Sequence, residues 1–228
     1  MKVTLLTHTP EPEKIIAASA KLCYSDCEAS EIMKNLTEEN TNKFVGILES
    51  LGHWSPFEHV NFTFSIDGCS RSATHQLVRH RHGSYSQRSQ RYVGEKMFNY
   101  VIPEEIKSNE KALKIFETAM NNDQSAYDDL VDILMESGLD DKIAFENARA
   151  VLPNACCTSI VVTMNVRELH HFFKMRCCNR AQDEIRAVAD EMLRICREVS
   201  PVLFKHAGAP CMSGSCGEGK MACGNPRK

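Results

Sequence analysis

The chain has 228 residues, a formal net charge of -3 and a sequence isoelectric point near 6.3. Hydrophobic residues make up 43% and charged residues 25%, the balance of an ordinary soluble globular protein, and no apolar run is long enough to span a bilayer. A slightly acidic chain with one Trp and five Tyr also argues against a nucleic-acid-binding module, which needs a broad basic surface and aromatic stacking platforms.

Residues 1–81 are predicted to alternate between strands and helices. Apolar and polar residues alternate before Asp67-Gly68, which indicates a strand with one buried face that ends at this pair. Gly52 stands where a helix would have its C-terminal cap. The predicted elements are a strand over 3–6, helices over 11–23 and 38–51, a strand over 60–66 and a helix over 71–81.

The remaining chain is predicted to be mostly helical. Residues 84–92 lack a helical period and indicate an ordered loop or an edge strand, and the β-branched run over 158–164 indicates a central strand. Helices are predicted over 104–137 (one long or two stacked), 139–151, 165–175 and 182–199. We therefore expect an α+β fold without internal repeats, with one domain over 1–206 and a Gly/Cys-rich surface tail over 207–228.

The N-terminus and the cysteines bear on the compartment. The N-terminal sequence is too short and too polar at its flanks for a secretory signal, so we expect a cytoplasmic protein. The eleven cysteines are an odd number and are expected to be reduced thiols rather than a disulfide framework. Cys23, Cys69 and Cys196 stand next to apolar residues and are predicted to be small core side chains.

Positive charge gathers in one acid-free stretch. Between Asp67 and Glu95 there is no acidic residue and no Lys. The stretch contains Arg71, Arg79, Arg81, Arg88 and Arg91, with His75, His80 and His82. A solvated basic surface is the commoner fate of such a run, but flexible surfaces favour Lys, whereas Arg forks suit phosphate.

Two spacings within this stretch favour an anion site. Gln76 and Arg79 are three apart on the predicted helix and should share a face. Gln87, Ser89 and Arg91 are two apart in an extended segment and should share a face as well. We therefore expect a helix end and the following loop to wrap a phosphate.

Several motifs together resemble one family. Arg79-His80-Arg81 is followed by seven residues and Ser89, and the segment His53-Trp54-Ser55-Pro56-Phe57-Glu58-His59 lies upstream. Asn147 to Pro153, Asn165-Val166-Arg167 and Met175-Arg176 follow downstream. In order and spacing over most of residues 1–205, these motifs resemble the flavin-dependent thymidylate synthases. The resemblance implies a mixed helical and antiparallel-sheet catalytic domain that forms a homotetramer with active sites between subunits.

The resemblance also implies a reaction. Deoxyuridine monophosphate (dUMP) would be methylated at uracil C5 to give dTMP, with the carbon coming from methylenetetrahydrofolate. FAD would carry the hydride, and NADPH would reduce the flavin. No G-x-G-x-x-G turn is present, so a Rossmann dinucleotide site is not expected. Neither a metal nor a nucleic-acid or membrane partner is expected.

Site residues follow from the matched motifs. Arg176 corresponds to the family arginine that faces the pyrimidine, where a fixed cation would stabilise negative charge on the N3–O2 edge and activate C5. Its position alone would favour a structural salt bridge with Glu184 or another acid, and the motif alignment reverses that preference. The implied nucleotide-binding residues are Gln76, Arg79, Gln87, Arg88, Ser89, Gln90, Arg91, Arg149 and Arg176. The implied FAD-binding residues are His53, Ser55, Arg79, His80, Arg81, Gln87, Asn165, Arg167 and His171.

This sequence departs from the family pattern at three positions. Gln87 stands where Glu is frequent, His171 where Asn is frequent and Arg180 where His is frequent. A neutral amide at position 87 can still form hydrogen bonds but contributes no charge. The contacts of His171 and Arg180 with flavin therefore stay open.

Cysteine chemistry offers two alternatives. The pairs Cys156-Cys157 and Cys177-Cys178 could supply a nucleophile, but neither has an obvious base, and the core interpretation is favoured. A zinc site could use His206, Cys211, Cys216 and Cys223, although their spacing lacks a C-x-x-C knuckle. A disordered, thiol-bearing tail is the favoured interpretation of that segment.

Overall fold

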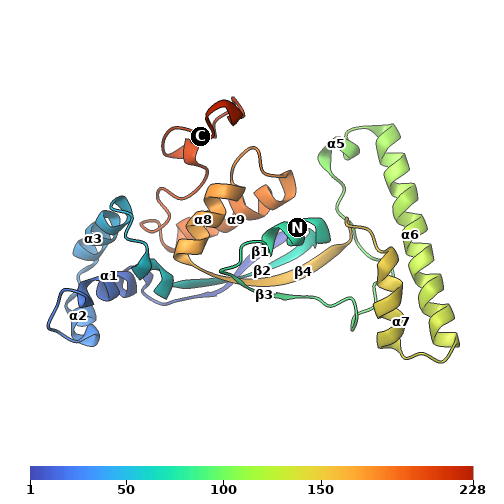
Figure 1. The fold of residues 1–228 in the computed structure, drawn as a ribbon, viewed down its shortest axis with the longest axis horizontal. Helices are drawn as coiled ribbons and strands as arrows, with labels where there is room; N and C mark the ends of the chain where they lie inside the picture. Colours follow the sequence, from blue (N-terminus) through green and yellow to red (C-terminus); the bar gives the residue numbers. More distant parts are fainter. Residues whose placement is uncertain (228) are drawn as a thin grey trace. The chain divides into compact units, whose positions relative to one another are not determined.

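The computed structural model describes residues 1–227, and its sheet confirms the α+β fold class. The sheet is antiparallel and has the strand order β1-β2-β4-β3 (Figure 1). Its strands are β1 (Lys2–His8), β2 (Asn61–Ser70), β3 (Ser84–Gln87) and β4 (Cys157–Asn165). As predicted, β4 is central and the segment after residue 84 begins with an edge strand.

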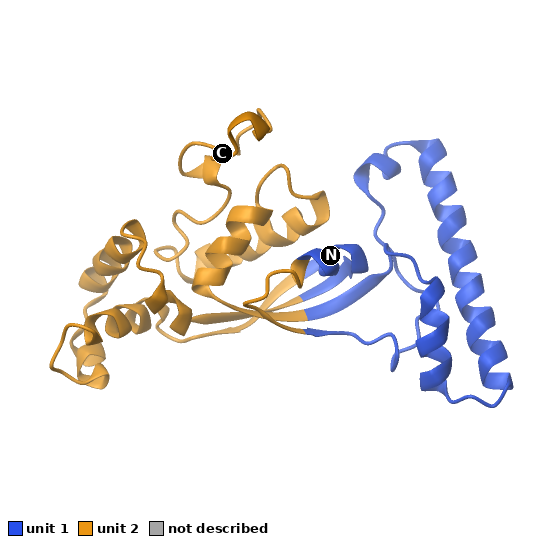
Figure 2. Cartoon of the chain, viewed as in Figure 1, with its two compact units in different colours: residues 1–2, 66–76, 86–160 blue, residues 3–65, 77–85, 161–228 orange. Residues whose placement is uncertain are grey.

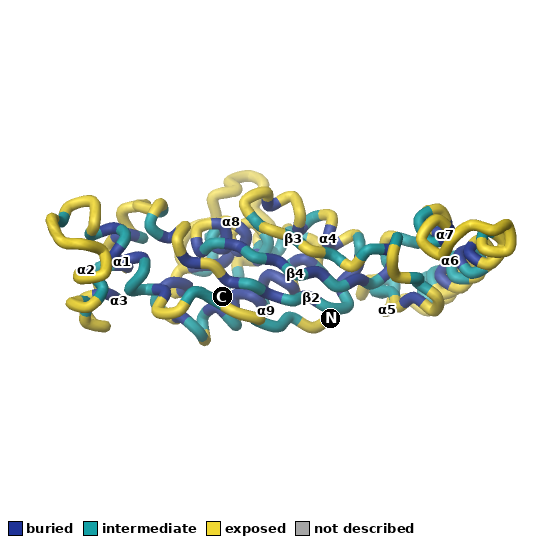
Figure 3. The backbone as a smooth tube through the Cα atoms, turned by 90° about the horizontal axis from the view of Figure 1, so that it is seen from below, coloured by how far each residue is buried: buried dark blue, intermediate teal, exposed yellow. Residues whose placement is uncertain are grey.

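The two central strands carry the buried face of the sheet. Side chains alternate between buried and half-buried along β4, and Phe62, Phe64 and Ile66 of β2 are fully buried. Figure 3 shows dark-blue segments alternating with teal ones along these strands. The period-2 pattern of the sequence therefore corresponds to real burial on one side of the pleat.

The chain divides into two compact units (Figure 2). Unit 1 contains residues 1–2, 66–76 and 86–160, and unit 2 contains the other described residues. The division passes through the sheet, so all four strands contribute residues to both units.

Unit 1 is built around one long helix. Its helices are α4 (Arg71–Leu77, with Leu77 in unit 2), α5 (Glu104–Lys107), α6 (Glu110–Glu136) and α7 (Asp141–Ala148), followed by the 3-10 turn η2 (Arg149–Val151). The N-terminus of α6 is capped by Asn109, whose side chain accepts hydrogen bonds from the backbone N–H groups of Lys111 and Ala112. Tyr127 and Val131 of α6 pack against Ala148 of α7, and all three are fully buried.

Unit 2 contains five helices and the 3-10 turn η1 (Ser55–His59). They are α1 (Pro12–Leu22), α2 (Ala29–Asn35), α3 (Glu38–Ser50), α8 (Val166–Arg176) and α9 (Asp183–Val199). Phe204, after α9, packs edge-on against Phe62 of β2 and Phe173 of α8. Only α2 has no counterpart among the predicted helices. Across residues 1–227, no helix combines the length and apolar character needed to cross a membrane.

One helix is shorter and one strand longer than predicted. The helix expected over 71–81 ends at Leu77. Beyond it, the Tyr85 hydroxyl lies 3.1 Å from the Leu77 carbonyl oxygen and 2.6 Å from that of His80, so a side chain satisfies acceptors that further helix would have used. Strand β2 continues to Ser70 because Gly68 adopts φ +74, a conformation open to glycine, and the chain does not turn there.

The C-terminal segment differs from the expected disordered tail. Ala207, Gly208 and Ala209 are buried, and two short 3-10 turns follow, η3 (Pro210–Met212) and η4 (Gly219–Met221). The Arg227 guanidinium donates to both carboxylate oxygens of Asp190 on α9 at 2.8 Å. A half-buried ion pair and buried small residues therefore hold this segment against the helices of unit 2.

The packing of α6 gives a stability prediction. The buried Tyr127 hydroxyl accepts a hydrogen bond from the Glu95 backbone N–H at 3.0 Å. Tyr127→Phe should lower the free energy of unfolding by about 1 to 2 kcal/mol, because a buried donor loses its acceptor. Tyr24→Phe is the matched control, since Tyr24 is 90% exposed. Urea unfolding of both variants measures the difference, and equal midpoints would contradict the assignment.

Candidate functional site

The predicted site residues fall into two groups, one in each unit. Gln76, Gln87, Arg88, Ser89, Gln90, Arg91 and Arg149 belong to unit 1. His53, Ser55, Arg79, His80, Arg81, Asn165, Arg167, His171 and Arg176 belong to unit 2.

In unit 1 the backbone after β3 is held in place by hydrogen bonds. The Arg88 backbone N–H donates to the Ser159 carbonyl of β4 at 3.0 Å, and its guanidinium lies 3.2 Å from the Ser159 hydroxyl. Arg71 donates to the Arg88 carbonyl at 2.9 Å, and Gln87 donates to the Thr74 hydroxyl at 3.1 Å. The Arg88 side chain is thereby fixed at the edge of the sheet.

Arg91 is paired with a carboxylate. Its Nε and Nη2 atoms lie 2.8 Å and 2.7 Å from Oε2 of Glu146 on α7. The two side chains are 40% and 39% exposed, so an anion from solution can reach the pair. A phosphate could take the place of the Glu146 oxygen, since both anions accept the same parallel N–H donors.

The extended face predicted for Gln87, Ser89 and Arg91 is wrong, because β3 ends at Gln87. The chain turns there: the Arg91 N–H donates to the Ser89 hydroxyl at 3.1 Å, and the Val93 N–H donates to the Ser89 carbonyl at 3.1 Å. The shared helix face of Gln76 and Arg79 is wrong for the same kind of reason, since α4 ends before Arg79.

Unit 1 also contains a polar cavity of about 650 Å³ beside β4. Arg88, Glu95, Lys96 and Ser159 are among its lining residues. Burial raises the pKa of Glu95 against the opposing effect of Arg71. Oε1 of Glu95 and Nε of Arg71 are buried without a hydrogen-bond partner in the described chain, which is unusual for a folded protein.

In unit 2 a buried imidazole connects two charged side chains. Nδ1 of His80 lies 3.3 Å from Oε1 of Glu168, and the Nε–H of Arg176 donates to Nε2 of His80 at 3.1 Å. His80 is 7% exposed and Glu168 6%. The ring of Phe172 meets His80 edge-on at 4.9 Å and excludes water from one side.

The charge state of His80 follows from this geometry. Burial, together with the nearby Arg176 and His171, lowers the pKa of His80 to about 4. The ring is therefore neutral at physiological pH. Because Arg176 is only a donor, Nε2 of His80 must accept, which assigns the proton to Nδ1 and directs it at Glu168. The neutral imidazole fixes the orientation of Arg176 without adding a second positive charge.

Exposed cations flank this buried ring. Arg79 and Arg81 have exposed side chains on either side of His80 in the sequence. The ring of His171, on α8, meets that of His80 at 5.7 Å. The Arg-His-Arg motif therefore has a structural reason: its middle residue is buried in the protein while its outer residues face solvent.

Unit 2 contains a cavity of about 430 Å³ that is lined by other predicted residues. Arg167 and His171 of α8 line it with Trp54 and His170. The Trp54 and His170 rings lie 4.8 Å apart, and Arg167 forms an ion pair with Glu58. His53 and Ser55 stand on either side of Trp54 in the sequence, and both are exposed. Asn165 has a local role, because its side chain caps α8 by accepting from the Glu168 N–H at 2.8 Å.

Two residues of this group were missed by the sequence analysis. Glu168 stands three residues after Asn165, so in sequence it resembles one half of a helix capping box. The structure shows its carboxyl group turned to His80 instead. Trp54 lies in the segment from His53 to His59, but nothing in the sequence distinguishes it from a core aromatic residue.

The cysteines behave mostly as core residues. Cys69, Cys156, Cys177 and Cys196 are buried. Burial raises the pKa of Cys156 to about 12, and burial with Asp190 raises the pKa of Cys177, so both are protonated thiols and poor nucleophiles. The prediction for Cys23 is wrong, because α1 ends at Leu22 and Cys23 is exposed.

The zinc set headed by His206 is not assembled. Nδ1 of His206 lies 3.3 Å from Oε2 of Glu49 on α3, away from the tail cysteines. Within residues 1–227, no three His, Cys, Asp or Glu side chains are close enough together to hold one metal ion.

Comparison with known proteins gives one consistent result. The family model described as "Thymidylate synthase complementing protein" matches residues 4–202. A flavin-dependent thymidylate synthase of Clostridium tetani is 51% identical over 98% of this chain and 93% of its own length. The same-named proteins of Geobacter sulfurreducens and Pyrococcus furiosus are 49% and 41% identical, over 98% and 85% of this chain and 94% and 78% of theirs.

The buried imidazole predicts a pH dependence of stability. The unfolded chain binds a proton at His80 near pH 6.5, whereas the folded chain resists it until about pH 4. The stabilisation is complete above pH 6.5 and is lost as pH falls through 4. His80→Gln cannot titrate, so its unfolding free energy should fall less over this window, by on the order of 1 to 3 kcal/mol.

Denaturant unfolding at a series of pH values measures this difference. His75→Gln is the matched control, because His75 is exposed on α4. If the two variants show the same slope between pH 4 and 6.5, His80 is not the buried neutral group described here.

Proposed function

The chain belongs to the flavin-dependent thymidylate synthase family, and on that premise we propose that it transfers the methylene carbon of methylenetetrahydrofolate to C5 of dUMP, with NADPH as reductant. The observation that carries this proposal is the family match over residues 4–202. Relatives that are 51% and 49% identical over 98% of this chain support it. FAD, when bound, carries the hydride between NADPH and the methylene group.

Residues of unit 2 fit the requirements of FAD. The exposed guanidinium groups of Arg79, Arg81 and Arg167 suit a pyrophosphate, and Trp54 with His170 provides an aromatic wall for a planar ring. His53, Ser55, His80, Asn165 and His171 complete the proposed FAD-binding set in unit 2, and Gln87 of unit 1 is proposed with them. Asn165 would act mainly through its cap, which sets the start of α8 and so the position of Arg167.

Arg176 is the proposed catalytic residue. Burial lowers its pKa, yet a guanidinium stays charged in a protein, so α8 ends with a permanent cation. Facing the N3–O2 edge of uracil, this cation would stabilise the negative charge that raises electron density at C5. Its Nε–H is held by neutral His80, which leaves the direction of the guanidinium plane determined before substrate arrives.

The residues of unit 1 are proposed to bind the nucleotide. Arg91 would exchange the Glu146 carboxylate for the phosphate, and Ser89, which is held by the Arg91 N–H, would lie beside it. Arg149 is exposed at the turn after α7, the helix that carries Glu146. Gln76, Gln87, Arg88 and Gln90 of unit 1 complete the proposed set, and Arg79 and Arg176 of unit 2 are proposed with them.

The assembly and the compartment are part of the same proposal. We propose a homotetramer with active sites at subunit interfaces, a catalytic domain over 1–206 and a cytoplasmic location. Exposed apolar side chains on α6 support an interface there, since Ile115 is 72% exposed and Ile133 59%. Light scattering of the purified chain would give the number of subunits directly.

The deciding experiment is anaerobic incubation of the flavin-loaded protein with dUMP, methylenetetrahydrofolate and NADPH. The proposal expects dTMP in amounts that exceed the enzyme, and omission of any one reactant should abolish it. Absence of dTMP from flavin-loaded protein, with all reactants present, would reject the proposal.

Arg176→Ala is the first predicted variant. It should reduce turnover by on the order of 10² to 10³-fold, because a cation directed at developing charge is lost. Flavin content and unfolding midpoint should stay near wild type. Arg194→Ala is the control, since Arg194 lies on α9 and pairs with Glu191 and Glu198 of the same helix. Turnover of Arg176→Ala within a few-fold of the control would remove Arg176 from the mechanism.

Glu146→Gln is the second predicted variant. The carboxylate competes with phosphate for the Arg91 fork, so its neutral replacement should tighten dUMP binding several-fold. Calorimetric titration with dUMP measures the change, and the control is Glu136→Gln at the end of α6, where the side chain is exposed. Weaker binding in Glu146→Gln would mean that Glu146 orients Arg91 rather than competes for it.

A further inference from the structure

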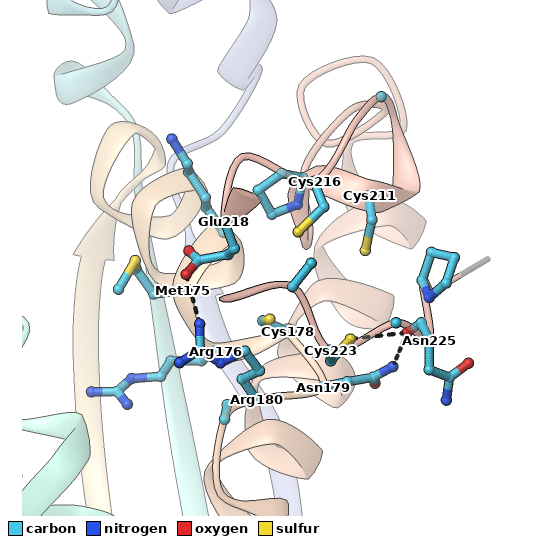
Figure 4. Close-up of a pocket in the computed structure, with 17 residues that line it drawn as sticks. Met175, Arg176, Cys178, Asn179, Arg180, Cys211, Cys216, Glu218, Cys223 and Asn225 are labelled. Carbon is cyan, nitrogen blue, oxygen red and sulfur yellow. Dashed lines mark hydrogen bonds and ion pairs between the residues drawn. The ribbon is translucent and has the colours of Figure 1, made fainter. Parts of the chain in front are cut away.

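Four cysteines line one cavity of about 580 Å³ at the C-terminal end of α8. Cys178 stands two residues after the end of that helix, and Cys211, Cys216 and Cys223 come from the C-terminal segment. Figure 4 shows the four side chains around a common space, with the Cys211 and Cys216 sulfur atoms on one side and those of Cys178 and Cys223 on the other. All four belong to unit 2 and are free thiols.

The grouping could not be read from the spacing in the sequence. Three of the four thiols that line the cavity come from the C-terminal segment, and the fourth comes from Cys178. His206 does not line this cavity. Cys178 follows a buried neighbour, Cys177, whose carbonyl oxygen accepts a hydrogen bond from Arg227 at 2.7 Å. The tail is thereby attached to the chain segment that bears the fourth thiol.

Polar contacts fix the walls of the cavity. Arg180 forms an ion pair with Glu218 at 2.7 Å, and the Asn179 amide donates to the Asn225 carbonyl at 2.7 Å. Arg227 also pairs with Asp190 of α9. The first two contacts join residues within two positions of Cys178 to residues within two positions of a tail cysteine, so they hold the C-terminal segment beside Cys178.

The surroundings of the sulfur atoms suit thiolates bound to a metal. The Arg227 backbone N–H lies 3.4 Å from the Cys211 sulfur, the kind of N–H···S contact that surrounds metal-bound thiolates. The Cys223 thiol donates to the Asn225 carbonyl oxygen at 3.3 Å, a hydrogen bond that is lost when Cys223 binds a metal as a thiolate. Lys174, Arg176 and Arg180 also line the cavity and outnumber its one carboxylate, Glu218, so the wall carries net positive charge.

We propose that Cys178, Cys211, Cys216 and Cys223 ligate a thiolate-bound metal centre. Four thiolates around a zinc ion or an oxidised iron–sulfur core leave a net negative charge, which the cationic wall offsets. Soft sulfur ligands without a histidine select zinc or iron–sulfur chemistry over hard cations.

The present positions of the thiols argue against a single zinc ion. The thiols of residues 1–227 are spread too widely for three of them to hold a single ion as they stand. The terminal ligands of a multi-iron cluster lie farther apart than those of a single ion, whereas zinc would require the C-terminal segment to move inward. Either metal would tie the tail to the end of α8, next to Arg176.

Metal analysis of the reconstituted full-length chain tests the proposal. Protein stripped of metal is incubated anaerobically either with Zn²⁺ or with ferrous iron and sulfide, desalted, and analysed for zinc, iron and acid-labile sulfide. Elemental analysis is used because flavin absorbs where clusters absorb. We expect about one zinc, or about four irons with matching sulfide, per chain.

The Cys211→Ser/Cys216→Ser double variant should lose most of this metal. The control is Cys23→Ser/Cys27→Ser, because both of those thiols are exposed and lie outside the cavity. Flavin uptake and circular dichroism show whether each variant is folded, and Cys178→Ser gives a second route if the double variant is not. No bound metal in wild type, equal metal in both double variants, or disulfides joining the four cysteines would overturn the proposal.

Discussion

A neutral, buried imidazole is the interaction on which the rest of the described site depends. His80 accepts from the Arg176 Nε–H and directs its own Nδ1–H at Glu168, so one ring connects the segment after α4 to both ends of α8. Burial keeps the ring uncharged, since its pKa is lowered to about 4. Were it charged, it would repel the guanidinium that it now orients. The site thus presents one fixed cation where chemistry needs it.

The arginine side chains of unit 1 are likewise already bound to acceptors within the protein. Arg91 is occupied by Glu146, and Arg71 and Arg88 are held through backbone carbonyl or hydroxyl groups. Arginine can satisfy several acceptors at once, which a point-charge lysine cannot do with the same geometry. This difference gives a physical reason for a stretch that contains five arginines and no lysine. Binding of an anion there would replace existing contacts rather than create a site from disordered side chains.

The C-terminal segment adds a second chemistry next to the first. It closes over the end of α8 through Arg180, Arg227 and Asn179, and the cavity so formed is lined by both Arg176 and four thiols. Anything that fixes this segment therefore also fixes the helix end that bears the proposed catalytic cation. A metal centre there would contribute to the rigidity of the site.

The sequence by itself determined the fold class, the central strands, nearly all helices and the family. These features rest on local periodicity and on motif spacing, which are properties of neighbours along the chain. Only the tertiary structure decided that α4 stops at Leu77, that Glu168 serves His80 rather than a cap, that Arg91 meets Glu146, and that Cys178 joins the tail thiols. Those outcomes depend on which side chains, far apart in the sequence, the folded chain brings within hydrogen-bond distance. A local sequence pattern does not contain this information.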